Sequence, residues 1–124
     1  MKGKTILVVD DEKEVVDALR NRLEREGYEV LTAYDGKQAL EKANDRPDLI
    51  LLDIIMPGLD GIEVLSRLKK NIETKHIPVV MVTAKGESKS ILDAEDIEVT
   101  DYIIKPFDIN ELVVLIKKYL DYLA

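Results

Sequence analysis

Short runs of apolar residues alternate with longer amphipathic stretches along the chain. Three runs are almost wholly aliphatic: TILVVD (5–10), LILLD (49–53) and PVVMVT (78–83). Continuous aliphatic runs of this length are typical of strands that a parallel sheet buries on both faces. Two further runs, YEVLTAY (28–34) and DYIIK (101–105), mix apolar and polar residues, which predicts strands nearer the edges of the sheet.

The stretches between these runs repeat apolar residues every three or four positions, which predicts amphipathic helices. Four stretches carry this repeat: 12–26, 36–45, 61–71 and 109–122. The segment 86–98 has only a thin apolar stripe, although the alternation of elements predicts a fifth helix there.

Possible helix caps support these helix starts. An Asp followed three residues later by Glu or Gln has the spacing of a capping box. Four such pairs occur: Asp11/Glu14, Asp35/Gln38, Asp60/Glu63 and Asp108/Glu111.

Strand and helix patterns therefore follow one another as β-α-β-α-β-α-β-α-β-α. This order predicts an α/β fold, with a five-stranded parallel sheet and five helices distributed over both of its faces. The chain has 124 residues, of which 46% are hydrophobic and 35% charged. These values are those of one globular domain, so we expect residues 1–124 to form a single unit.

Charge and composition narrow the possible functions. The formal net charge is −7 and charges of both signs are spread along the chain, which argues against a nucleic-acid-binding surface. No apolar run is long enough to cross a bilayer and no signal peptide precedes the first strand, so we expect no membrane contact and a cytoplasmic location. Cysteine is absent, which excludes disulfides and thiolate metal sites.

Chemically useful side chains stand at the ends of four predicted strands. These residues are Asp10 and Asp11, Asp53, Thr83, and Lys105. Ligands of open parallel sheets bind beyond the carboxyl ends of the strands, so we expect these side chains to share one edge. Asp53 interrupts an aliphatic run, where a carboxylate is costly unless another group pairs with it. Taken singly, each residue also has an ordinary interpretation, as a helix cap, a strand residue or a solvated lysine.

The residue types suggest phosphoryl chemistry. Three carboxylates cannot stay ionised in a small space without a counter-charge, and a hard cation such as Mg²⁺ would supply one. One carboxylate can act as a nucleophile and form an aspartyl phosphate. A metal and the lysine would then offset charge on the transferring oxygens, and the threonine hydroxyl could bond the attached phosphoryl group.

Four motifs together resemble one known family. LVVDDE, LLDIIMPGLDG, VTA and DYIIKPF occur in order, and with them the whole chain resembles the CheY-like receiver domain of bacterial two-component response regulators. The resemblance implies a flavodoxin-like, doubly wound sheet of strand order 2-1-3-4-5. It also implies a phosphorylation-dependent signalling switch that is not an enzyme acting on external substrates.

The resemblance implies a role for each site residue. Asp53 matches the phosphoacceptor, Thr83 the switch hydroxyl and Lys105 the lysine that pairs with the phosphoryl group. Tyr102 matches the aromatic residue whose rotamer reports activation, although a tyrosine in a strand is more often a packing residue. The resemblance also implies a cis peptide bond between Lys105 and Pro106.

The same resemblance implies a metal site for Mg²⁺, with Mn²⁺ as an alternative. Asp11 matches the direct ligand and Asp10 its partner, which usually acts through water. Asp53 and the backbone carbonyl of Ile55 would complete the protein ligands.

Partners are implied as well. The phosphoryl donor would be a sensor histidine kinase or a phosphotransfer protein, and a downstream protein target would bind the face formed by residues 86–122. No output domain is found within these residues, which leaves a stand-alone regulator and a piece of a longer regulator as alternatives. One departure from the family is that Glu98 and Val99 replace the usual Gly and Ala after the fourth helix.

Three other functions fit the residues less well. A phosphatase with an aspartate nucleophile usually has a second Asp two residues later, where this chain has Ile55. A nucleotide-binding module needs a glycine-rich loop after the first strand, but DDEKE is acidic. A pseudo-receiver that only binds partners would lack an acid, the threonine or the lysine, and this chain retains all of them.

Overall fold

The computed structural model describes residues 3–56, 58, 60–84 and 99–121. These residues form nine elements in chain order: β1 (Thr5–Val9), α1 (Lys13–Arg25), β2 (Glu29–Ala33), α2 (Gly36–Ala43), β3 (Leu49–Asp53), α3 (Gly61–Lys70), β4 (Val79–Ala84), β5 (Asp101–Lys105) and α5 (Ile109–Leu120). All five predicted strands are confirmed, as are four of the five helices. The fifth, predicted over 86–98, lies outside the described residues.

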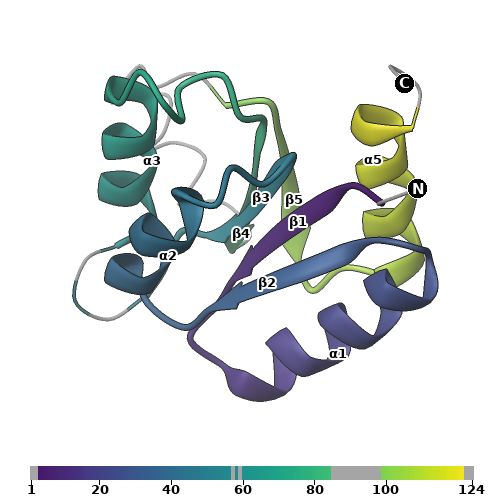
Figure 1. Cartoon of the computed structure of the whole chain (residues 1–124). Helices are drawn as coiled ribbons and strands as arrows, with labels where there is room; N and C mark the ends of the chain where they lie inside the picture. Colours follow the sequence, from purple (N-terminus) through teal and green to yellow (C-terminus); the bar gives the residue numbers. More distant parts are fainter. Residues whose placement is uncertain (1–2, 57, 59, 85–98, 122–124) are drawn as a thin grey trace.

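The five strands form one parallel sheet with the order β2-β1-β3-β4-β5. This is the order that the resemblance implied, and β2 and β5 are the edge strands, as their mixed composition predicted. The helices cover both faces of the sheet (Figure 1), with α2 and α3 on one side and α1 and α5 on the other.

Two hydrophobic clusters explain the aliphatic strand sequences. Alternate residues of a strand point to opposite faces of the sheet. In β1, Leu7 and Val9 therefore join the cluster beneath α2 and α3, while Ile6 and Val8 join the cluster beneath α1 and α5. All four side chains are almost wholly buried. A strand that faces helices on both sides has no position left for a polar residue until it ends.

Helix starts are capped largely as predicted. The Asp35 side chain accepts a hydrogen bond from the Gln38 backbone N–H, and Asp60 accepts one from Glu63. Asp108 also caps its helix, although its side chain accepts from the backbone N–H of Asn110 and not from that of Glu111.

The predicted cap at Asp11 is wrong. The N-cap of α1 is Glu12, whose side chain makes no capping hydrogen bond. The Glu12 backbone N–H instead donates to Asp10 Oδ1 at 2.9 Å. The carboxylate of Asp10, one residue earlier than predicted, therefore satisfies a backbone donor at this helix start, and Asp11 is exposed.

The structure also bears on the predicted cis peptide bond and on the length and hydropathy of the helices. The peptide bond between Lys105 and Pro106 is cis, as the resemblance implied. In the described part of the chain, no helix combines the length and the hydropathy needed to cross a bilayer.

Candidate functional site

The parallel register brings the ends of four strands to one edge of the sheet. Val9 pairs with Leu52, so that Asp10 and Asp53 are the next residues on neighbouring strands. Asp53 in turn pairs with Val82, and Ala84 pairs with Lys105. The Asp10, Asp53 and Lys105 side chains, at the ends of β1, β3 and β5, therefore meet, as the strand-end argument predicted, while Thr83 lies in the neighbouring strand β4.

Lys105 bridges the two buried carboxylates of this edge. Its Nζ lies 3.2 Å from Asp10 Oδ2 and 3.2 Å from Asp53 Oδ2. The Asp10 and Asp53 residues are only 3% and 6% exposed. A carboxylate so deeply buried is tolerated only when it is paired and hydrogen-bonded. The lysine supplies that pairing, which explains how an aspartate can end an aliphatic strand.

Burial and charge act against each other on Asp53. Burial raises the pKa of Asp53, the positive charge of Lys105 opposes this rise, and the negative charge of Asp10 adds to it; the net direction is upward. Burial alone would lower the pKa of Lys105, but Asp53 and Asp10 outweigh it, and the pKa of the lysine is raised. The lysine therefore stays charged at neutral pH between its two partners.

The loop after β3 holds the other oxygen of Asp53. The backbone N–H of Ile55 donates to Asp53 Oδ1 at 3.1 Å, while the Ile55 side chain is 63% exposed. At the start of α3, the Gly61 N–H donates to the Ile54 carbonyl at 2.8 Å. A Cβ on residue 61 would overlap the Asp53 carbonyl oxygen, so only glycine allows α3 to begin this close to the acid.

Three successive acids offer ligands for a metal ion. One carboxylate oxygen from each of Asp10, Asp11 and Glu12 lies within 4.8 Å of the other two. Asp10 is buried, whereas Asp11 and Glu12 are exposed. Oxygen donors with an open, solvated side suit a hard cation such as Mg²⁺, which keeps several of its waters.

The acidic group differs from the predicted set of ligands. Glu12 was not among the predicted ligands, although the DDE string is visible in the sequence. Asp53 is not a member of this three-acid group, and the backbone carbonyl of Ile55 stays a predicted ligand. Asp53 is joined to Asp10 through Lys105, and its place in the metal site stays a prediction.

The two predicted switch residues lie on β4 and β5. Thr83 is buried and follows Val82, the partner of Asp53 in the sheet. Tyr102 pairs with Met81 and packs, half-buried, against the cluster beneath α2 and α3. This packing explains a strand tyrosine without any switch role, and the switch role itself stays a prediction.

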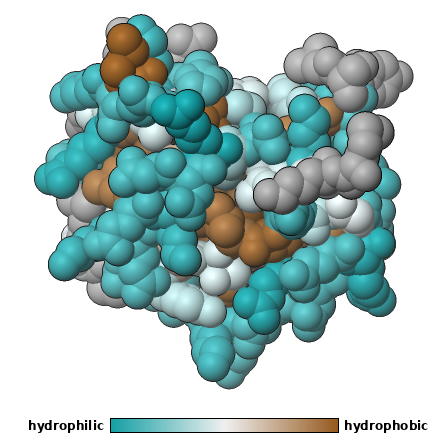
Figure 2. Space-filling model, in the orientation of Figure 1, coloured by the Kyte–Doolittle hydropathy of each residue, from teal (hydrophilic) through white to brown (hydrophobic). Residues whose placement is uncertain are grey.

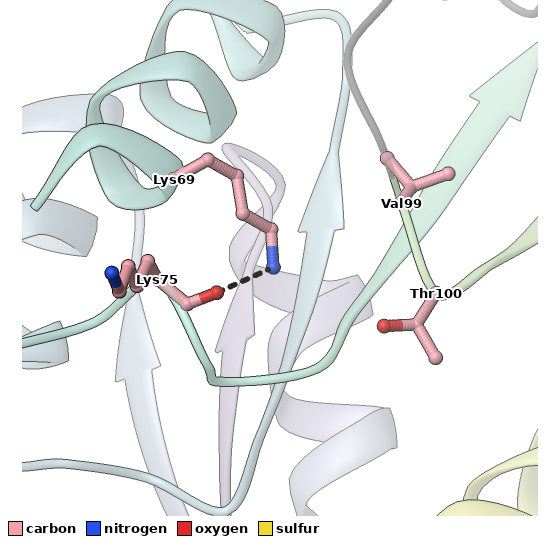
Figure 3. Close-up of a pocket in the computed structure, with 4 residues that line it drawn as sticks. All are labelled: Lys69, Lys75, Val99 and Thr100. Carbon is pink, nitrogen blue, oxygen red and sulfur yellow. Dashed lines mark hydrogen bonds between the residues drawn. The ribbon is translucent and has the colours of Figure 1, made fainter. Parts of the chain in front are cut away.

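A separate pocket lies near the amino ends of β4 and β5 (Figure 3). It has a volume of about 230 Å³ and is lined by Lys69, Lys75, Val99 and Thr100. The Lys69 ammonium donates to the Lys75 carbonyl at 3.3 Å and to the Ile77 carbonyl at 3.0 Å. This lysine therefore helps to close the turn before β4, near the amino ends of β4 and β5. Among the described residues, none of the strand-end acids lines this pocket.

Comparisons with known proteins agree with this geometry. The family model described as "Response regulator receiver domain" matches residues 6–117. The phosphate regulon transcriptional regulatory protein PhoB of Pseudomonas aeruginosa is 46% identical over 97% of this chain and 53% of its own length. The alkaline phosphatase synthesis transcriptional regulatory protein PhoP of Bacillus subtilis is 44% identical over 95% of this chain and 49% of its own. The chain thus spans about half the length of these relatives.

Solved structures show the same architecture. The receiver domain of NtrX from Brucella abortus is 38% identical, with a TM-score of 0.82, over 94% of this chain and 98% of that one. The chemotaxis protein CheY4 of Vibrio cholerae is 29% identical, with a TM-score of 0.86, over 95% of this chain and 99% of that one.

Proposed function

The chain belongs to the response regulator receiver domain family, and from that premise we propose that it is a phosphorylation-dependent switch whose phosphoacceptor is Asp53. The observation that carries the proposal is the ion-paired group at the sheet edge. Asp53 is a buried carboxylate with one oxygen on Lys105 and the other on a backbone N–H. The acidic group of Asp10, Asp11 and Glu12 stands beside it.

The reaction needs few groups beyond these. An oxygen of Asp53 attacks the phosphorus of the donor, the bond between phosphorus and the donor's leaving atom breaks, and the leaving group departs with that electron pair. Lys105 is placed to move from the carboxylate toward the new phosphoryl oxygens and to offset their charge. The Thr83 hydroxyl is our candidate to hydrogen-bond the attached group.

The acids are our candidates to hold the metal. Asp10, Asp11 and Glu12 would bind Mg²⁺ through carboxylate oxygens, with Asp53 and the Ile55 carbonyl as further protein ligands. When bound, the ion supplies positive charge that stabilises the transferring phosphoryl group. Mn²⁺ prefers similar oxygen ligands and is the alternative ion.

The donor and the target are also proposals. We propose that a sensor histidine kinase or a phosphotransfer protein donates the phosphoryl group in the cytoplasm, and that the face of residues 86–122 binds a protein target. Thr83 and Tyr102 would link the phosphoryl group to that face. A net charge of −7 argues against a nucleic-acid surface within these 124 residues.

A labelling experiment tests the phosphoacceptor. The wild type, Asp53→Asn and Asp45→Asn are incubated with a small acyl phosphate and Mg²⁺, and intact mass is measured. We expect one added phosphoryl group on the wild type and on Asp45→Asn, whose changed acid is exposed and far from the site. We expect none on Asp53→Asn. Undiminished labelling of Asp53→Asn would show that another residue is the acceptor.

A further inference from the structure

The outer edge of β2 is an open strand edge. β2 ends the strand order and pairs only with β1. The Glu29 N–H donates to the Lys4 carbonyl, and the Ala33 carbonyl accepts from the Asp10 N–H, so the backbones of Glu29 and Ala33 face β1. Because backbone groups alternate in direction along a strand, those of Val30 and Thr32 face outward. Among the described residues, no strand pairs with this side.

A hollow follows this edge at the amino end of the strand. Its volume is about 540 Å³, and its lining residues are Thr5, Glu24, Tyr28, Glu29, Val30, Leu31 and Asp45. Val30 packs toward α1 and α5, whereas Leu31 packs toward α2 and α3, so the hollow spans both sides of the strand edge. In Figure 2 a hydrophobic strip, flanked by hydrophilic surface, runs along the course that β2 takes in Figure 1.

The walls of the hollow are acidic. Glu24 comes from α1, Glu29 begins β2 and Asp45 follows α2, and all three are exposed. The residues that line the hollow include no Lys, Arg or His. An occupant would therefore meet carboxylates on both sides of the strand edge, with half-buried Val30 and Leu31 between them.

We propose that β2 docks an extended peptide, in which pairs of basic residues alternate with pairs of apolar residues, as a sixth strand of the sheet, so that basic side chains reach both faces. The outward N–H and C=O groups of Val30 and Thr32 would hydrogen-bond the peptide backbone, and the carboxylates would bind its basic side chains. This surface lies near the amino end of β2, whereas the phosphoryl site lies beyond the carboxyl ends of the strands. The proposal therefore does not depend on the proposed function.

The negative charge of this edge favours a basic peptide over a second copy of the chain as the occupant. Pairing β2 with another β2 would bring two sets of Glu24, Glu29 and Asp45 together, and like charges on paired strands are destabilising. Edge strands are also commonly protected by short length and charged residues. Such protection would repel a second acidic edge, whereas a basic strand would be attracted to it.

Synthetic peptides test the backbone part of the proposal. The probe is a fluorescein-labelled peptide in which pairs of lysines alternate with pairs of valines, and its fluorescence anisotropy is measured during titration with the wild-type chain. The controls have the same sequence with N-methylated backbone amides, or glutamate in place of lysine. We expect each control to bind at least about tenfold more weakly. Equal binding of the N-methylated peptide would overturn strand addition.

Charge-reversed variants locate the binding surface. Glu24→Lys/Asp45→Lys is compared with Glu14→Lys/Glu111→Lys, which changes the net charge equally at two exposed residues away from the hollow. We expect the first pair of substitutions to weaken binding of the probe about tenfold, and the second pair to weaken it less than about twofold. Equal losses in both pairs would mean that the peptide follows only the net charge. If sedimentation shows a dimer that Glu24→Lys/Asp45→Lys abolishes, this edge binds a second copy instead. Equal losses in both pairs, or such a dimer, would overturn the proposal.

Discussion

Charge balance at single residues shapes the strand-end site. Lys105 contributes one positive charge between Asp10 and Asp53, so the buried group has one negative charge more than it has positive charges. Asp11 and Glu12 add two more carboxylates at its exposed side. A buried ion pair alone is weak evidence for stability, because desolvation offsets much of the attraction. The excess of negative charge instead favours a site that binds a cation.

Ile55 provides a prediction at the scale of one side chain. Water that hydrolyses an aspartyl phosphate must approach phosphorus opposite the carboxylate oxygen. Ile55 stands beside Asp53 with its side chain exposed, and it cannot position a water as an amide could. We expect a second residue, Lys85, two positions after Thr83, to flank the same approach, and it lies outside the described residues. We expect Ile55→Asn to lose its phosphoryl group several-fold faster than the wild type, about 1 kcal/mol in barrier.

The measurement is the decay of phosphorylated protein over time after removal of the phosphodonor. Ile72→Asn is the matched control, because Ile72 is also a well-exposed isoleucine but lies in the segment between α3 and β4. If Ile55→Asn decays at the rate of the wild type, Ile55 does not shield the phosphoryl group.

Individual elements are positioned by a few close contacts. The start of α3 lies directly against β3, because Gly61 has no side chain and its N–H bonds the Ile54 carbonyl. At the other face of the sheet, Glu26 at the end of α1 accepts from Lys117 of α5 at 2.8 Å and from Arg22 of its own helix at 3.0 Å. The first of these contacts links α1 to α5, in addition to their hydrophobic packing.

Gly61→Ala tests the contact between α3 and β3. The added methyl group would overlap the Asp53 carbonyl oxygen, which is backbone and can move only with the strand end. We expect a loss of about 1–3 kcal/mol in the free energy of unfolding, the usual cost of overpacking, together with slower phosphorylation. Urea unfolding and the labelling assay measure the two effects. Ser66→Ala in the same helix is the control, and equal behaviour of the two variants would refute the steric argument.

Glu26→Gln tests the contact between α1 and α5 through its pH dependence. Hydrogen bonds from Lys117, and then from Arg22, lower the pKa of Glu26 below its ordinary value of 4.5. An acid whose pKa is lower in the folded state stabilises the fold above the unfolded pKa, and this stabilisation is lost as the pH falls through the folded value. We therefore expect Glu26→Gln to be less stable than the wild type at neutral pH, with a difference that shrinks in acid.

Urea unfolding midpoints at about pH 7 and about pH 3.5 measure this difference. Glu24→Gln removes the same charge from an exposed position of the same helix and is the control. A gap between wild type and Glu26→Gln that stays constant across this range would contradict the assigned ion pairs.

Two kinds of surface lie at opposite ends of the strands of one sheet. The carboxyl ends of the strands carry the acids and the lysine, and the amino end of β2 carries the proposed docking edge. Relatives of about twice the length are similar in sequence over nearly the whole of the present chain. The arrangement suits a module that receives a signal at one edge while other surfaces contact partner proteins.

Magnesium should change the stability of the whole fold. Asp10, Asp11 and Glu12 repel one another, so we expect Asp11→Ala to raise the melting temperature without metal and to weaken Mg²⁺ binding. A ligand that binds only the folded state adds about 2.7 kcal/mol at a hundred times its Kd. We therefore expect the wild type to gain more from Mg²⁺ than the variant does. Thermal melts with Mg²⁺ and with a chelator measure both effects, and a variant that melts lower in both while binding Mg²⁺ normally would contradict the prediction.

The sequence alone determined the nine described elements and the identity of most candidate site residues. Strand and helix periodicities are local, so they appear in short windows of sequence, and the strand ends then placed Asp10, Asp53 and Lys105 at one edge. The strand order came from the resemblance of the motifs, because periodicity alone leaves several topologies open.

Only the tertiary structure decided which groups meet. Lys105 pairs with Asp53 and Asp10, which lie 52 and 95 positions earlier in the chain, and no local pattern encodes such a pairing. The structure also places the cap of α1 at Glu12 instead of Asp11 and joins Glu12 to the acidic group, and in the described part of the chain it leaves one edge of β2 unpaired. The physical reason is that these contacts depend on strand register and helix placement, which arise when the whole chain packs around its two hydrophobic clusters.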